Sequence, residues 1–269
     1  AQPAEEDATV VARMRDAGAL LIGKANMTEI GLGVTGLNLI HGTPRNPYGP
    51  DHYTGGSSSG PATAVAAGLC PIALGADGGG SIRIPAAFCG LTGLKATYGR
   101  VSEHGAAPLT WSMGHIGPLA ATAADAALAY AVIAGADPKD RNSTLQPPPT
   151  LAGWDREDLG DLTVGLYPPW FEHATGEVVA ACRAMIDALE ERGARLREVT
   201  IPGLEAARIA HSITITAEMI AALSGVWDDH YDEHGLDVRV TLALAKTFLA
   251  SDYVQAQRVR TQLLETFDA

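Results

Sequence analysis

The sequence predicts an α/β fold, and three observations support this class. Two strand-like stretches, residues 162–167 and 195–201, flank a helical pattern over 176–192, which is the spacing of a β-α-β unit. Hydrophobic residues make up 46% of the chain and charged residues 19%, a balance typical of a folded globular protein. The 269 residues are also enough to bury a sizeable core.

The first third of the chain divides into elements by its apolar spacing. Helical spacing predicts a helix over residues 5–17, and the apolar run at 18–22 predicts a short buried strand. Residues 31–60 are rich in Gly, Pro, Asn and Thr, so we expect a long irregular stretch. A run of small residues at 61–69 predicts a helix with Pro near its start, and residues 71–74 predict a strand.

The later chain alternates in the same way. Residues 75–80 form a glycine-rich turn, and residues 124–133 predict an alanine-rich buried helix. Residues 136–152 contain the run PKDRNSTLQPPPT, which is typical of a linker. Apolar positions over 241–267 indicate a helical region with one packed side.

Charge and cysteine content narrow the class of protein. The net charge is −12, from 19 Lys and Arg against 31 Asp and Glu, so neither nucleic acid nor an anionic membrane is a favoured partner. Cys70, Cys89 and Cys182 are far apart and include no C-x-x-C, which indicates reduced thiols in the cytoplasm. Residues 1–10 lack the basic and apolar regions typical of a signal peptide, and no apolar run reaches the length of a membrane span. We expect no cofactor and no metal.

Two glycine-serine segments are the candidates for chemistry, residues 55–60 (GGSSSG) and 75–83 (GADGGGSIR). Composition alone leaves open that both are flexible turns. Neither has the lysine of a phosphate-binding P-loop, and neither fits the dinucleotide pattern or the G-x-S-x-G elbow. A nucleophilic serine needs a tight turn and converging N–H donors, which consecutive glycines before Ser81 could supply.

The combination of motifs resembles the amidase signature family. The run over 55–100 matches its signature, and residues 23–29 (GKANMTE), 45–47 (RNP) and 117–120 (GPLA) match elements outside it. The resemblance is continuous over about residues 5–135 and thinner beyond. The triple serine at 57–59 resembles the sequence of the plant-type fatty acid amide hydrolase branch at this position.

This resemblance implies a Lys–Ser–Ser triad. Ser57, preceded by a cis peptide bond, takes the bridging role and Ser81 the nucleophile role; their separation, 81 − 57 = 24 residues, agrees with the family. The N–H groups of Gly78, Gly79, Gly80 and Ser81 would bind the oxyanion.

Three further residues are predicted to support the loop. We expect Arg83 to hold it through Asp77 or through backbone carbonyls, with an ordinary surface arginine as the alternative. Asp77 is predicted to stabilise the turn rather than act as an acid, and Ser58 to belong to the same network.

The resemblance also implies a fold and a domain plan. The fold is a mixed β-sheet core covered by helices on both faces. We expect one domain over 1–269, comprising a signature core (1–135), a linker-like loop (136–152) and a continuation (153–269). The family's lysine precedes the bridging serine by tens of residues, so we expect a fragment that lacks the lysine segment and is nearly inactive alone. Lys246, the last of four lysines, has no matching motif around it.

The predicted function is hydrolysis of a carboxylic amide, with a fatty acid amide or N-acylethanolamine as candidate substrates. The alternatives are a non-catalytic scaffold and a glutaminyl-tRNA amidotransferase A-type subunit. The partner would be a small-molecule amide, and a homodimer is one expected assembly. His230 and His234, four residues apart among carboxylates, could bind a metal, but a solvated acidic helix face is the favoured interpretation.

Overall fold

The computed structural model describes residues 4–225 and 227–268, and these divide into two compact units. One unit contains residues up to 151 together with 211–253, and the other contains 152–210 together with the residues from 254 on. The boundary after Leu151 falls at the end of the stretch predicted as a linker. The single domain predicted over 1–269 stays a prediction, and each unit is described by itself.

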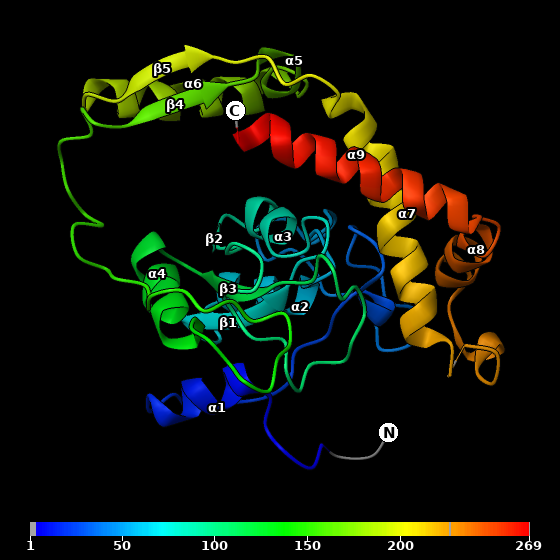
Figure 1. Ribbon diagram of the computed structural model, residues 1–269. Coiled ribbons are helices and arrows are strands. Elements are labelled where there is room, and N and C mark those ends of the chain that lie inside the picture. The colour runs from blue at the N-terminus through cyan, green and yellow to red at the C-terminus, as the bar shows by residue number, and fades with distance from the viewer. Residues whose placement is uncertain (1–3, 226, 269) are drawn as a thin grey trace. The chain divides into compact units, whose positions relative to one another are not determined.

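Helices and strands are interspersed along the chain up to β5, and helices follow from there on (Figure 1). The helices are α1 (Thr9–Asp16), η1 (Glu29–Gly31), α2 (Ser59–Ala66), α3 (Arg83–Phe88), α4 (Ala123–Ile133), α5 (Pro168–Phe171), α6 (Gly176–Glu191), α7 (Leu204–Leu223), η2 (Tyr231–Glu233), α8 (Leu236–Ala245) and α9 (Ala250–Asp268). The strands are β1 (Ile72–Ala76), β2 (Thr92–Gly93), β3 (Ile116–Ala120), β4 (Thr163–Leu166) and β5 (Arg195–Glu198).

The larger unit is built on a three-stranded antiparallel sheet in the order β1-β3-β2, with Leu74 opposite Pro118 in β3. Successive strand residues point to opposite faces. Ile116 accordingly joins the core cluster with Val10 of α1 and Ile133 of α4. Leu119 joins a second cluster with α2 and α3. Helices therefore cover both faces of this sheet, as the resemblance implies.

The smaller unit contains the predicted β-α-β arrangement. Strands β4 and β5 are parallel, with Val164 opposite Leu196, and α6 connects them. The α/β class is confirmed, but the antiparallel and parallel pairs belong to separate sheets in the described residues rather than to one mixed sheet.

One prediction from the apolar patterns is wrong. Residues 18–22 form no strand, because no other described strand lies beside them to accept and donate backbone hydrogen bonds. Their apolar side chains are not buried either: Leu20 is 90% exposed and Ile22 73% exposed. The helical region predicted over 241–267 is confirmed, as two helices, α8 and α9, separated by a short break.

The stretch predicted as a linker is irregular, but its first part is firmly anchored. The Asp137 carboxylate accepts hydrogen bonds from Thr9 Oγ1 and Ser102 Oγ, both at 2.6 Å, and its backbone N–H donates to Ser143. Burial opposes ionisation of Asp137, but these two hydroxyls and the N–H of Lys139 outweigh it and lower the pKa to about 2. This part of the loop therefore belongs to the larger unit.

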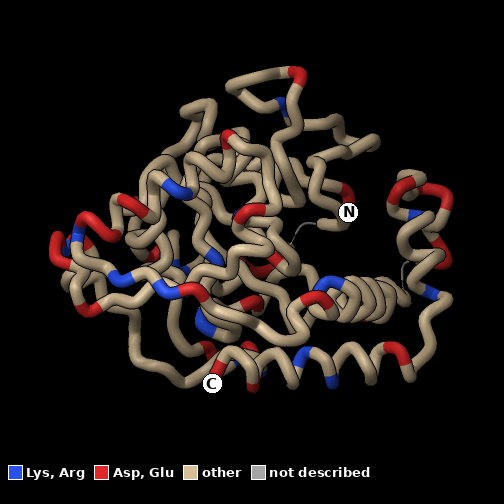
Figure 2. The backbone as a smooth tube through the Cα atoms, turned by 90° about the horizontal axis from the view of Figure 1, so that it is seen from above, with Lys and Arg blue, Asp and Glu red and all other residues tan. Residues whose placement is uncertain are grey.

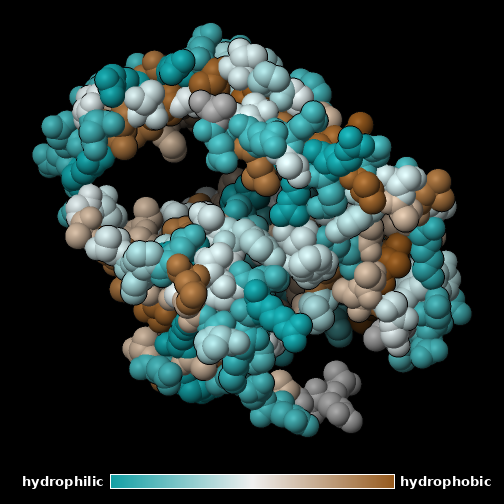
Figure 3. Space-filling view, viewed as in Figure 1, coloured by the Kyte–Doolittle hydropathy of each residue, from teal (hydrophilic) through white to brown (hydrophobic). Residues whose placement is uncertain are grey.

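The surface is mixed in charge and hydropathy. Lys and Arg positions are interspersed with Asp and Glu positions along the backbone (Figure 2). On the face drawn in Figure 3, hydrophobic side chains form separate groups among hydrophilic ones. Across the described residues, no helix combines the length and the apolar character needed to cross a membrane.

Candidate active site

Ser81 lies on a tight loop between β1 and α3, and the Asp77 side chain organises that loop. The Asp77 carboxylate is almost fully buried and accepts hydrogen bonds from the N–H groups of Gly80 (2.7 Å) and Ile82 (3.1 Å). Gly80 has φ +122°, a conformation that side-chain-bearing residues rarely adopt. The loop thus curls around one carboxylate and leaves Ser81 half-buried at its end.

Arg83 completes this arrangement at the first residue of α3. Its Nε donates to one oxygen of Asp77 and its Nη2 to the other, each at 3.0 Å. Burial favours a neutral Asp77, but the Arg83 hydrogen bonds and the two backbone donors outweigh it and hold the pKa of Asp77 below its ordinary value. The same hydrogen bonds raise the pKa of Arg83. The loop is therefore held by an ionised pair.

Ser57 lies on a second loop, directly before α2. Hydrogen bonds join this loop to the nucleophile loop. The peptide bond between Gly56 and Ser57 is cis. The N–H of Ser58 donates to the carbonyl of Ser81 at 3.2 Å, and Ser58 Oγ bonds to both the carbonyl and the N–H of Ala76. Ser58 therefore ties the segments that carry Ser57 and Ser81 to each other and to β1.

The two candidate catalytic serines differ in exposure, and Ser81 is the more exposed one. Ser57 is buried, and its Oγ faces Gly31, where an added Cβ would lie 3.8 Å from it. Within residues 4–225 and 227–268, no hydrogen bond joins Ser57 Oγ to Ser81 Oγ or to a lysine. Three lysine side chains donate hydrogen bonds to other groups instead: Lys95 to the carbonyl of Ala96, Lys139 to Glu6 and Lys246 to Asp228.

A lysine and a histidine lie behind the nucleophile loop; Lys95 falls within the signature run over 55–100, whereas His115 lies outside it. His115 Nδ1 is 2.8 Å from the carbonyl of Met113 and 3.2 Å from that of Asp77. Its Nε2 is 3.3 Å from Lys95 Nζ. Burial lowers the pKa of both groups, reinforced at His115 by the charge of Lys95. This pair fixes the carbonyl side of the Asp77 turn.

Helix α7 supplies side chains to the opposite side of the loop, and sequence reasoning missed these as well. A Cβ placed on Gly79 would lie 2.6 Å from His211 Nε2, and one on Gly78 would lie 3.3 Å from Ile215 Cδ1. His211 and Ile215 are one helical turn apart, so they share a helix face. No motif surrounds His211, and the contact with Gly79 joins residues 132 positions apart (211 − 79), so only tertiary structure reveals it.

The two histidines considered as metal ligands bind different carboxylates. His230 Nδ1 is 2.8 Å from Glu233, and His234 Nδ1 is 3.0 Å from Glu29, a residue 205 positions earlier. His234 also stacks on Trp227. In the described part of the chain, no group of three or more His, Cys, Asp or Glu side chains is placed to hold a metal ion.

Comparison with known proteins identifies the family. A family model described as Amidase matches residues 1–266. The chain belongs to the amidase family. A crystal structure described as an amidase superposes with a TM-score of 0.85 at 34% identity and covers 99% of this chain and 58% of its own. An amidase of known structure thus shares the fold of this chain.

Two curated amidase relatives bear on the substrate. A fatty acid amide hydrolase from Medicago truncatula is 44% identical over 272 residues, which cover 98% of this chain and 44% of that protein. The A subunit of a glutamyl-tRNA(Gln) amidotransferase from Roseiflexus sp. (strain RS-1) is 39% identical over 279 residues, covering 97% of this chain and 57% of that protein. The chain therefore spans about half the length of these relatives.

Proposed function

We propose that the protein hydrolyses carboxylic amides through a covalent acyl-enzyme on Ser81, with Ser57 as the bridging proton carrier. The observation that carries this proposal is the hydrogen bond from Ser58 N–H to the Ser81 carbonyl, which joins the two serine loops beside the glycine turn. Because the chain spans 44% of the Medicago relative, the activity is proposed for the whole protein.

The proposed reaction has two steps. Ser81 Oγ attacks the amide carbonyl while its proton passes to Ser57, whose own proton passes to a neutral lysine, the family's general base. The proton returns through Ser57 to the leaving nitrogen as the C–N bond breaks. Water then hydrolyses the resulting ester by the reverse proton path. N–H groups at Gly78 to Ser81 would bind the oxyanion; one such donor is typically worth about 2.7–4 kcal/mol in the transition state.

The supporting roles follow from the contacts already described. Asp77 and Arg83 are proposed to keep the N–H groups of the loop aimed at one point, and Ser58 to set the spacing between the two serines. Fatty acid amides, including N-acylethanolamines, are the first substrates to test, because the Medicago relative is described as a fatty acid amide hydrolase.

The first experiment uses a fluorophosphonate probe on the full-length protein, with the labelled peptide identified by mass. We expect an adduct on Ser81, which Ser81→Ala abolishes and Ser57→Ala slows by about 10²–10⁴-fold. Ser143→Ala, which changes a hydroxyl far along the chain, is the control and should label normally. A folded protein that carries no adduct on Ser81 contradicts the proposal and favours a non-catalytic scaffold.

A second candidate is an amidotransferase A-type subunit, favoured by the 39% identity to the Roseiflexus protein. Such a subunit would act in a complex, whereas an amide hydrolase acts alone or as the proposed homodimer. Light scattering on the purified protein, combined with turnover of a simple amide, separates the two.

Location in the cytoplasm is proposed from the free thiols of Cys70, Cys89 and Cys182.

A further inference from the structure

One side of α7 lies against the glycine turn that precedes Ser81. His211 Nε2 and Cε1 lie 2.6 and 3.0 Å from the position that a Cβ on Gly79 would occupy. Ile215 and Thr110 take the corresponding places next to Gly78, at 3.3 and 3.1 Å. The imidazole therefore borders the same turn whose N–H groups are proposed to face the substrate.

The hydrogen-bonding capacity of the His211 ring is unused. The ring is half-buried, and no residue in the described ranges forms a hydrogen bond with it. Burial lowers the pKa of His211, and the nearby positive charge of Arg83 adds to this, while Asp77 opposes it. The neutral ring then has one nitrogen that donates and one that accepts.

His115 provides the contrast on the other side of the same loop. Both of its ring nitrogens have protein neighbours, Met113 and Asp77 on one side and Lys95 on the other. A structural histidine in this environment is therefore fully engaged. Unlike the His115 nitrogens, His211 Nε2 borders the turn without a protein partner in the described residues, so a ligand bound at the turn can hydrogen-bond to it.

We propose that His211 is a substrate-binding residue that selects amides, with its Nε2 accepting a hydrogen bond from the N–H of the scissile amide. This inference rests on the proposed hydrolase function. The loop N–H groups would donate hydrogen bonds to the amide oxygen. The amide N–H of the substrate then still needs an acceptor. An ester of the same acid has no such donor, so His211 would contribute to amide turnover and not to ester turnover.

Three proteins and two substrates test this role. Full-length wild type, His211→Met and His211→Gln are assayed with the primary amide and the methyl ester of one fatty acid. Met removes the acceptor at similar size, whereas the side-chain oxygen of Gln can restore it. We expect His211→Met to lose about 10- to 100-fold in kcat/KM on the amide and less than about twofold on the ester. His211→Gln should recover most of the amide activity.

Fluorophosphonate labelling of Ser81 controls for folding, because the probe has no amide N–H. Equal labelling rates in all three proteins show that the loop is intact. Equal losses on amide and ester, or no loss on the amide, would overturn the role of His211 alone. Wild-type protein that neither turns over a substrate nor labels at Ser81 would overturn the proposed function and this inference with it.

Discussion

Asp77 is the residue on which the nucleophile loop depends. Its carboxylate binds the N–H groups of Gly80 and Ile82 and both donors of Arg83 that face it. Because its pKa is held below the ordinary value of 3.8, its contribution to stability is fully present above that pH and is lost as the pH falls through the lower folded-state pKa. The loop should therefore loosen in acid, below pH 3.8.

Asp77→Asn should destabilise the protein by about 2–3 kcal/mol at pH 7, because charged hydrogen bonds are replaced at a buried site. Arg83→Lys should cost less, about 1 kcal/mol, since Arg83 is half exposed and its partner keeps its backbone donors. Urea unfolding at pH 7 and pH 3 measures both. Equal stability of Asp77→Asn and wild type at pH 7 would contradict this account.

Glu103 shows the opposite behaviour. Burial and the charge of Asp140 raise its pKa to about 7. The folded protein therefore keeps this proton where an unfolded glutamate, near 4.5, has released it. The stabilising contribution is full below about 4.5 and is lost as the pH rises through about 7.

Glu103→Gln should therefore make the protein more stable than wild type at pH 8, by about 1–2 kcal/mol after allowance for solvent screening. At pH 4 the two should be alike, because both side chains are then uncharged. Thermal unfolding at the two pH values provides the comparison. The exposed Glu190, changed to Gln, is the control and should show no such pH-dependent gain.

At the scale of single residues, the family resemblance predicts that Ser57 and Ser81 work together, and their catalytic roles stay predictions. In the structure their loops are joined by the hydrogen bond from the Ser58 N–H to the Ser81 carbonyl. His115 and His211 could not be found in this way. Each reaches the loop across a long sequence separation and has no local pattern of its own.

The elements were predictable where one local signal dominated. Helix α4 agrees with its prediction because Thr122 caps it, accepting from the Asp125 N–H at 3.1 Å, and Ala126, Ala129 and Ile133 are buried. Helix α7 was not predicted. Its run of Ile and Thr from Ile213 to Thr216 has low helix propensity and resembles a strand, so tertiary packing decides its conformation.

The contact between α7 and the glycine turn gives a prediction at the scale of the element. Gly79→Ala should displace the His211 ring, because the new Cβ would lie 2.6 Å from Nε2. Amide turnover should fall in Gly79→Ala, and adding His211→Met should bring little further loss because both changes remove the same contact.

A double-mutant cycle on kcat/KM for the amide measures this coupling. Gly176→Ala, at the start of α6, has nothing within 4 Å of the new Cβ and is the matched control, with turnover unchanged. Strictly additive losses from Gly79→Ala and His211→Met would show that the ring and the turn act independently.

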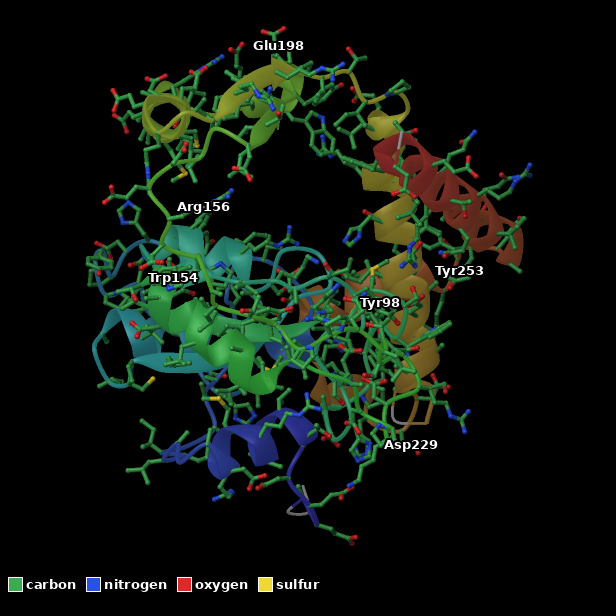
Figure 4. All side chains as sticks on the ribbon, turned by 60° about the vertical axis from the view of Figure 1, so that its left-hand side comes forward. Tyr98, Trp154, Arg156, Glu198, Asp229 and Tyr253 are labelled. Carbon is green, nitrogen blue, oxygen red and sulfur yellow. The ribbon has the colours of Figure 1, made fainter. Side chains whose placement is uncertain are left out.

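At the scale of the whole chain, the boundary after Leu151 should be a preferred site of proteolysis. Trp154 is 53% exposed and follows this boundary, on the irregular stretch that leads to β4 (Figure 4). Trp111 is comparably exposed, at 61%, but its carbonyl accepts hydrogen bonds from Tyr98 and Asn142. Hydrogen-bonded backbone resists the local opening that a protease needs.

We therefore expect chymotrypsin to cut first at Trp154 and only later at Trp111. Mass spectrometry of an early digest identifies the first cut, and Trp154→Ala should delay it. A first cut at Trp111 would contradict the view that its carbonyl hydrogen bonds protect that segment.

The exposed residues 18–22 have a consequence for colloidal behaviour. Leu20 and Ile22 present apolar side chains beside backbone that lies in no sheet, which is a ready contact for another molecule. The net charge of −12 opposes such contacts through mutual repulsion. At 0.1 M ionic strength, salt largely screens the repulsion between charges more than about 10 Å apart. Raising the ionic strength should therefore promote clustering, and Leu20→Lys should suppress it.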